Sequence, residues 1–157
     1  MKRDFVFMDD QKKAIVILVA DDDADDRLLI KEAFEEARLL NPIHFVEDGE
    51  ELFDYLKRRK KYTDMRDKPM PGLLLLDLNM PKKNGFEALK EIKSDESLRQ
   101  LPIVVFTTSK IEEDIYRSYN LGVNSFITKP VTFQSLVSVM ETLAHYWFEI
   151  VELPGVK

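Results

Sequence analysis

Short apolar runs alternate along the chain with longer segments in which apolar residues recur every three or four positions. The runs lie at residues 14–20, 43–46, 73–76, 102–106 and 123–128. Runs of this length, rich in β-branched residues or leucine and bounded by turn residues, are typical of strands buried on both faces. The segments between and after them carry charged residues opposite the apolar ones, which predicts amphipathic helices.

Helix boundary signals occur at five places. The predicted helices are a segment after the acidic run at residues 21–26, residues 50–61, residues 86–93, a segment from Ser109 to about Leu121, and a segment following Thr132. Residues 109–112 match the capping-box pattern, and Gly122 is a typical helix terminator. Residues 62–72 are polar and contain two prolines, so we expect a long exposed loop there.

Four leucines, Leu73 to Leu76, run directly into Asp77. Leucine alone would also suit a buried helix, but Pro71-Gly72 before the run and Pro81 after it leave too little room for one. Asp77 is therefore expected at the C-terminal end of a central strand. A carboxylate there is either a structural cap for the next turn or a paired, metal-bound or reactive group.

The alternation of five strands with five helices predicts an α/β fold. Such a pattern implies βαβ units, a parallel sheet and right-handed crossovers, which together give a doubly wound sheet of strand order 2-1-3-4-5. We expect one domain at residues 14–148, flanked by tails at residues 1–13 and 149–157, and no attached output module.

Composition excludes several classes of protein and site. The chain has 23 Lys and Arg against 29 Asp and Glu, a formal net charge of −6, which disfavours a nucleic-acid-binding role. It has no cysteine and two histidines, so thiolate and multi-histidine metal sites are not expected. No apolar run is long enough for a membrane span and the N-terminus does not resemble a secretory signal, so we expect a cytoplasmic protein. The basic run 57–61 is expected to be a solvated helix end.

Polar residues follow four of the five predicted strands. Asp21 and Asp22 follow the first strand, Asp77 the third, Thr107 the fourth and Lys129 the fifth. In a sheet of order 2-1-3-4-5 the first and third strands are neighbours, so the three carboxylates would converge at the edge where ligands bind. Carboxylates this close repel each other unless a cation lies among them, and oxygen ligands favour Mg²⁺. A metal, a lysine and a hydroxyl around one carboxylate suit an incoming phosphoryl group.

Each of these signals has an ordinary alternative. An acidic run is more often a solvated helix start than a metal site, a Lys-Pro pair after a strand is usually a turn, and threonine is common at strand ends. Their occurrence at consecutive strand ends, in this order, distinguishes the pattern from these ordinary alternatives.

The chain resembles the receiver domain of two-component response regulators. The matching residues are Asp21-Asp22, the segment Asp77-Leu78-Asn79-Met80-Pro81, Gly85, Thr107 and Lys129-Pro130. The resemblance implies a flavodoxin-like fold, and it implies that Asp77 accepts a phosphoryl group from a phosphohistidine on a sensor histidine kinase. It further implies that Asp22, Asp77 and the backbone carbonyl of Asn79 bind Mg²⁺ directly, with Asp21 acting through water.

The same resemblance implies roles for residues around the phosphoryl site. Lys129 would bridge toward the phosphoryl group and Thr107 would bond to it, and the Lys129–Pro130 peptide is expected to be cis. Phe126 holds the position of the family's aromatic switch residue, where it would move together with Thr107; the alternative is a simple core residue. Thr108 is bulkier than the residue usual there and is expected to slow hydrolysis.

The C-terminal segment is rich in aromatic and aliphatic residues. Together with the long segment before the third strand, it is similar to small stand-alone regulators that partner bacterial phytochromes. Its apolar residues between 146 and 153 either pack locally or form a partner or homodimer surface. A phytochrome-type kinase and a histidine phosphotransfer protein are the partners that the resemblance implies.

Three other classes of protein share parts of the pattern. A haloacid-dehalogenase-type phosphatase would carry its nucleophile on the first strand and an acid two residues later, where this chain has Asn79. A flavin carrier of the same fold would not place carboxylates beside its phosphate. A degenerate receiver would lack part of the acidic set. We therefore expect self-catalysed phosphoryl acceptance and no turnover of a free substrate.

Overall fold

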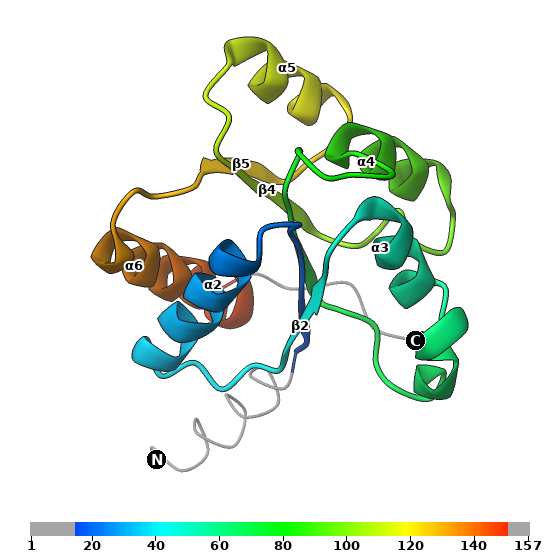
Figure 1. The fold of residues 1–157 in the computed structure, drawn as a ribbon, viewed down its shortest axis with the longest axis horizontal. Helices are drawn as coiled ribbons and strands as arrows, with labels where there is room; N and C mark the ends of the chain where they lie inside the picture. The colour runs from blue at the N-terminus through cyan, green and yellow to red at the C-terminus, as the bar shows by residue number, and fades with distance from the viewer. Residues whose placement is uncertain (1–14, 151–157) are drawn as a thin grey trace.

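A central sheet with helices on both faces forms the molecule (Figure 1). The structure is a computed structural model that describes residues 15–150, so most of both predicted tails lies outside the described residues. Its elements are, in chain order, β1 (Ile17–Ala20), α2 (Ala24–Glu36), β2 (Ile43–Val46), α3 (Gly49–Leu56), the 3₁₀ turn η1 (Lys60–Met65), β3 (Leu73–Leu76), α4 (Gly85–Ser94), β4 (Ile103–Thr107), α5 (Glu112–Asn120), β5 (Ser125–Thr128), α6 (Phe133–Ala144) and the π-helical turn η2 (His145–Ile150).

The predicted strand order is confirmed. Within residues 15–150 the five strands are all parallel and lie in the order β2-β1-β3-β4-β5. Strand β1 pairs with β3 over its whole length, from Ile17 opposite Leu73 to Ala20 opposite Leu76. The two strands therefore end side by side, and the residues that follow them start from the same edge of the sheet.

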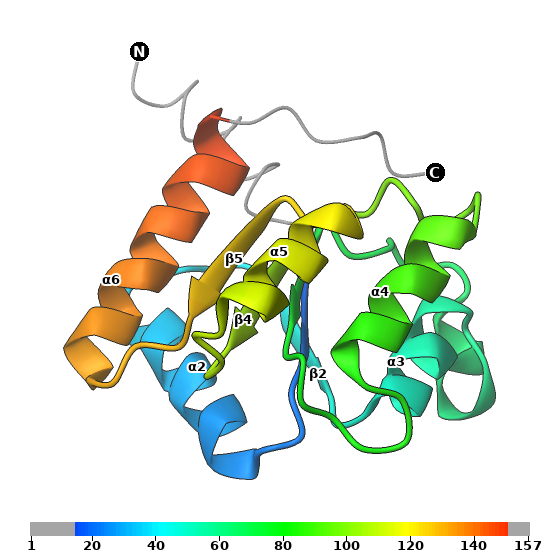
Figure 2. The same ribbon diagram turned by 90° about the horizontal axis from the view of Figure 1, so that it is seen from above.

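The leucine run is a strand because both of its sides are buried. Leu74 and Leu76 pack into the core beneath α3 and α4, whereas Leu73 and Leu75 pack into the core beneath α2 and α6. Figure 2 shows these two layers of helices on either side of the sheet, with α2 and α6 together on one face. No helix in the described part of the chain is both long and apolar enough to cross a membrane.

Helix α3 ends earlier than predicted, at Leu56 rather than at residue 61. Arg58 adopts a left-handed conformation with φ of 54°. The N–H of Arg59 then bonds the carbonyl of Asp54 at 2.7 Å, and that of Arg58 bonds Tyr55 at 3.2 Å, which is the Schellman helix ending. The segment predicted as a loop after it begins with the short η1 turn.

The basic run is not simply a solvated helix end. Arg58 is buried, and its guanidinium donates to the carbonyls of Tyr55, Lys68 and Pro69 at 2.9, 3.4 and 3.0 Å. The lysines of the run pair with carboxylates, for example Lys61 with Glu51 at 2.8 Å. The run therefore ties the segment after α3 to the fold, and its charge is largely neutralised by neighbours.

The capping box predicted at residues 109–112 is wrong. Helix α5 begins at Glu112 and the residue before it provides no side-chain cap, while the Ser109 hydroxyl instead donates to Asp114 Oδ2 at 2.6 Å. A complete capping box occurs at the start of α4, where Asn84 and Glu87 exchange hydrogen bonds. The predicted cap of the last helix by Thr132 is confirmed, as is the helix ending at Gly122.

The aromatic C-terminal segment packs partly onto the protein itself. Trp147 and Phe148 are both buried in the core beneath α2 and α6, whereas Tyr146 is 51% exposed. Neighbouring residues on a regular α-helix point about 100° apart. Trp147 and Phe148 lie instead in the wider π-helical turn η2. Local packing accounts for these two side chains, and the homodimer surface stays a prediction.

Candidate functional site

The ends of four strands bring the predicted residues to one edge of the sheet. Asp21 and Asp77 are the first residues beyond β1 and β3, and the N–H of Asp77 bonds the carbonyl of Ala20 at 3.0 Å. Thr107 is the last residue of β4, and its carbonyl accepts from the N–H of Lys129 at 2.7 Å. The parallel ladder continues to these residues, and this is why their side chains meet.

Asp77 lies at the centre of the group and is 5% exposed. Its Oδ1 accepts from the Thr107 hydroxyl at 2.8 Å and from the backbone N–H of Asn79 at 3.1 Å. Its Oδ2 accepts from the Lys129 ammonium at 2.8 Å. Both carboxylate oxygens are therefore oriented, and the structural-cap interpretation of Asp77 is too narrow, because most of these contacts come from other strands.

Lys129 is a partly buried cation surrounded by carboxylates. Its Nζ lies 2.7 Å from Asp21 Oδ2, 2.7 Å from Asp26 Oδ2 and 2.8 Å from Asp77 Oδ2. Burial works against its charge, but hydrogen bonds to Asp21, Asp26 and Asp77 outweigh burial and hold the pKa of Lys129 above its usual value. The ammonium is therefore a fixed positive charge next to Asp77.

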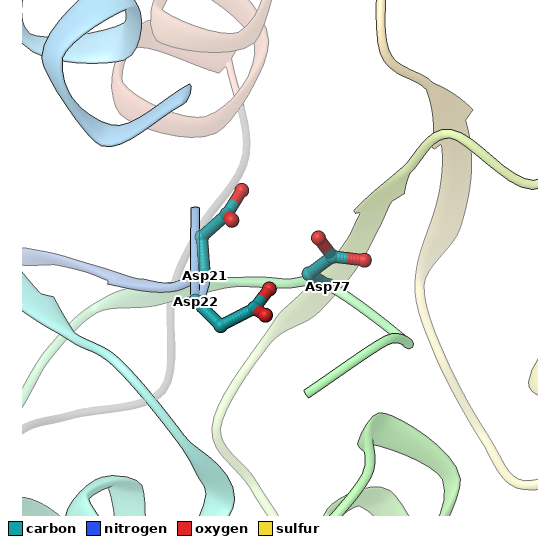
Figure 3. A group of neighbouring side chains, drawn as sticks. All are labelled: Asp21, Asp22 and Asp77. Atoms are coloured by element: carbon teal, nitrogen blue, oxygen red, sulfur yellow. The ribbon is translucent and has the colours of Figure 1, made fainter. Parts of the chain in front are cut away.

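The three predicted metal-binding carboxylates lie together. One oxygen from each of Asp21, Asp22 and Asp77 falls within a group no more than 4.8 Å across. Figure 3 shows Asp21 and Asp22 leaving the end of β1, with the carboxylate of Asp22 extending toward that of Asp77. Burial raises the pKa of Asp21, opposed by its bond to Lys129. A set of hard oxygen donors on this scale suits a divalent cation such as Mg²⁺ or Mn²⁺.

Backbone contacts hold the two loops that carry these carboxylates. The Arg27 guanidinium donates to the carbonyl of Asp21 at 2.8 Å, and the N–H of Asp23 bonds Asp21 Oδ1 at 2.9 Å. On the other side, Gly85 lies so close to the loop after β3 that a Cβ there would be 2.6 Å from the carbonyl oxygen of Asp77. Glycine at this position lets α4 pack directly against the segment that presents Asp77.

The remaining predicted residues lie around this centre. Asn79 is exposed in the loop after Asp77; the structure shows its N–H on Asp77, while a metal-binding role of its carbonyl stays a prediction. Thr108 is exposed next to the buried Thr107. Phe126 lies in β5, partly buried against the α3–α4 core, and its N–H donates to the Tyr119 hydroxyl at 3.2 Å.

The peptide bond between Lys129 and Pro130 is trans, so the predicted cis form is wrong; residues 15–150 contain no cis peptide. The N–H of Lys129 is already held by the Thr107 carbonyl, and the side chain reaches Asp77 from the trans backbone. Orientation of the lysine thus does not depend on a cis bond here.

Two residues of the site were not singled out from the sequence. The sequence pattern marks Asp26 only as part of an acidic helix start and gives no signal for Arg27, yet they contact Lys129 and Asp21 respectively. Asp26 lies in the first turn of α2, next to other acidic residues, and only its contact with Lys129 sets it apart from them.

Comparison with known proteins agrees with this geometry. Residues 17–141 match the family described as the response regulator receiver domain. Response regulator Rcp1 of Synechocystis is 36% identical over 141 residues, which cover 90% of this chain and 93% of Rcp1.

Solved structures of similar proteins show the same fold. A crystal structure of the phosphorylated cyanobacterial phytochrome response regulator RcpA matches with a TM-score of 0.81 and 38% identity, covering 90% of this chain and 99% of RcpA. The Mn²⁺-bound form of Rcp1 matches with a TM-score of 0.79 and 35% identity, covering 90% and 99%.

The family match spans the whole sheet and all the strand-end residues described above. The predicted flavodoxin-like receiver fold and the resemblance to stand-alone phytochrome-associated regulators are confirmed. With this match over most of its length, the chain belongs to the response regulator receiver domains of two-component signalling.

Proposed function

We propose that Asp77 accepts a phosphoryl group from the phosphohistidine of a sensor histidine kinase and that this modification switches a signalling surface. The observation that carries the proposal is the set of contacts on Asp77. Thr107 and the Asn79 N–H hold one carboxylate oxygen, and the Lys129 ammonium holds the other. This is an arrangement in which a carboxylate nucleophile is oriented beside a fixed positive charge and a hydroxyl donor.

The transfer is a displacement at phosphorus. A carboxylate oxygen of Asp77 bonds to phosphorus, the bond from phosphorus to the donor's imidazole nitrogen breaks, and the nitrogen keeps the electron pair. Lys129 balances the negative charge of the phosphoryl oxygens from beside Asp77, and Thr107 donates to one of them from the end of β4. The chain thereby catalyses its own modification and turns over no free substrate.

Mg²⁺ is the cofactor we propose. Asp22, Asp77 and the backbone carbonyl of Asn79 would hold it directly and Asp21 through water, in keeping with the acidic group shown in Figure 3. When bound, the ion supplies positive charge that offsets the carboxylates and the phosphoryl oxygens. Among residues 15–150, the Asp22 carboxylate has no hydrogen bond or ion pair of its own, so it is available as a ligand.

The proposed switch runs from Thr107 to the α5–β5–α6 face. Thr107 bonds Asp77 in the present structure, and a phosphoryl group would draw its hydroxyl outward. Phe126 lies on the neighbouring strand, opposite Val105 in the β4–β5 ladder. Phe126 has no hydroxyl, but its backbone N–H bonds the Tyr119 hydroxyl of α5 at 3.2 Å. A shift of Phe126 would therefore be transmitted to α5 through this hydrogen bond.

The similarity to Rcp1 and RcpA favours a kinase of the phytochrome type as the phosphoryl donor. A histidine phosphotransfer protein as the next acceptor, and a homodimer formed through the C-terminal segment, belong to the same proposal. Phosphoryl transfer requires the chain to share a compartment with its kinase's catalytic domains, which we propose is the cytoplasm.

Intact mass after incubation with acetyl phosphate and Mg²⁺ tests the proposal. We expect the wild type to gain one phosphoryl group, and Asp77→Asn to gain none, because the amide is not a nucleophile. Asp64→Asn is the matched control, since Asp64 is exposed in η1, and it should gain the group as the wild type does.

Fast hydrolysis could hide the modified form, so beryllofluoride binding is measured in parallel. This phosphoryl mimic needs the same pocket and does not hydrolyse. Phosphorylation that persists in Asp77→Asn, or a wild type that takes up neither the phosphoryl group nor beryllofluoride, would show that the proposal is wrong.

A further inference from the structure

The Lys129 ammonium contacts three carboxylates, and it donates hydrogen bonds to two of them, Asp26 and Asp77. An ammonium has three N–H groups, and Nζ has three partners, Asp21, Asp26 and Asp77, at 2.7, 2.7 and 2.8 Å. Asp21 and Asp77 belong to the strand-end pattern. Asp26 does not, because it comes from the first turn of α2.

Among residues 15–150, Asp26 is the one carboxylate partner of Lys129 that does not belong to the acidic group suited to a metal. That group consists of Asp21, Asp22 and Asp77. A cation held there would compete with Lys129 for two of its three partners. The bond from Lys129 to Asp26 is the contact that such competition leaves in place.

The start of α2 fixes the direction of Asp26. Asp23 caps the helix by accepting from the N–H groups of Asp25 and Asp26 at 2.8 and 3.1 Å, and Arg27 anchors the same turn to the carbonyl of Asp21. Successive residues on a helix point about 100° apart. Asp26 therefore faces the sheet edge and is partly buried, while Asp25 is exposed and makes no ion pair within residues 15–150.

We propose that Asp26 is a positioning residue that holds Lys129 and competes with the phosphoryl group for it. This inference rests on the proposed function. A phosphoryl group on Asp77 must recruit an N–H of Lys129, and Asp26 retains another while placing a negative charge within reach of the same ammonium. Asp26 therefore disfavours the phosphorylated state, because it competes for Lys129, and Lys129 stabilises the phosphoryl group.

Replacement of Asp26 by asparagine removes the negative charge of the side chain and keeps its shape. The amide oxygen can still accept from Lys129, but the negative charge is gone. We expect Asp26→Asn to bind beryllofluoride, at saturating Mg²⁺, about three- to tenfold more tightly than the wild type, a modest gain because solvent screens a site near the surface. Binding of Mg²⁺ alone should weaken by about twofold, since one nearby negative charge is lost.

These opposite changes distinguish positioning from a structural role, because a merely loosened helix start would weaken both ligands. Asp25→Asn is the matched control: it removes a carboxylate from the same helical turn, and both affinities should stay at wild-type values. Asp26→Glu keeps the charge and should bring beryllofluoride affinity back toward the wild type. Fluorine NMR reports beryllofluoride binding, and titration calorimetry reports Mg²⁺ binding.

Equal affinities in Asp26→Asn and Asp25→Asn, or weaker binding of both ligands to Asp26→Asn, would overturn this inference while leaving the proposed function intact. A wild type that binds no beryllofluoride would overturn both. The two failures are thus distinguishable within one set of titrations.

Discussion

At the residue scale, two cations act in different ways: Lys129 is partly buried and Arg58 is buried. Lys129 contacts carboxylates that follow β1 and β3 and one from α2. Arg58 instead bonds only backbone carbonyls and lies over the Tyr55 ring, 4.8 Å from its centroid. A planar guanidinium can bond several carbonyls at once, which an ammonium on a flexible chain does less well. Arg58 therefore has a structural role that its neighbours in the basic run do not share.

Arg58→Ala is expected to destabilise the protein by about 2 kcal/mol, because carbonyls that the guanidinium now bonds lose their partner. Chemical denaturation measures this change. Limited proteolysis within residues 60–72 should also become faster, since the side chain joins α3 to the far end of that segment.

Arg59→Ala is the control for this prediction. Its side chain is exposed and pairs with Asp54 at 3.7 Å, which stabilises little in water. Equal loss of stability in the two variants would mean that Arg58 has no special role.

At the scale of secondary-structure elements, helix α4 sets the position of the site. Asn84 and Glu87 cap its first turn reciprocally, and the N–H of Gly85 bonds the carbonyl of Leu78 at 2.9 Å. The helix therefore starts in direct contact with the loop that follows Asp77. Any group larger than hydrogen at Gly85 would meet backbone atoms of Asp77 and Leu78, each 2.6 Å from the added carbon.

Gly85→Ala should destabilise the fold by about 1–3 kcal/mol, as overpacked core substitutions do. It should also slow phosphorylation by acetyl phosphate, because the loop carrying Asp77 must move away from α4. Thermal unfolding and the rate of mass gain measure the two effects. Ser94→Ala, an exposed change at the other end of α4, should alter neither; an unchanged rate in Gly85→Ala would contradict this account.

At the scale of the whole molecule, the fold gathers negative charge at one end of the sheet. Asp21, Asp22 and Asp77 lie within one small group, and Lys129 is the cation among them. Folding brings these carboxylates from far apart in the chain to within a few ångströms of each other. A divalent cation that binds the folded chain should therefore stabilise it by linkage.

Mg²⁺ is expected to raise the free energy of unfolding, by about 2.7 kcal/mol at a concentration about 100 times its Kd. Thermal or denaturant unfolding at increasing Mg²⁺ measures this rise. Asp22→Asn should remove most of it, because Asp22 is the exposed member of the acidic group, whereas the exposed Asp25→Asn should retain it. A rise that persists in Asp22→Asn would place the metal elsewhere.

The fold and most of the site were predictable from local patterns. Leu73–Leu76 between Pro-Gly and proline could only be a short buried strand, and alternation with helices then implied parallel pairing. Because parallel strands end at one edge, the positions of Asp21, Asp77, Thr107 and Lys129 in the chain were enough to predict that they meet.

The tertiary structure decided what depends on side-chain direction and on contacts between distant segments. Whether residues 57–61 continued a helix depended on the left-handed turn at Arg58 and on carbonyls about ten residues away. The cap expected from Ser109 was lost to a competing bond with Asp114. Asp26 became a partner of Lys129 only through the tertiary packing that places the start of α2, which lies against α6, near the end of β5.

The sequence by itself therefore determined the order of the elements, the edge that carries the site, and the residues that lie there. These follow from hydrophobic period and strand polarity, which are local properties of the chain. The tertiary structure decided which carboxylates share Lys129, where α3 ends and how Trp147 and Phe148 are both buried. Those outcomes are set by competition among partners brought together only after folding, and no local pattern records them.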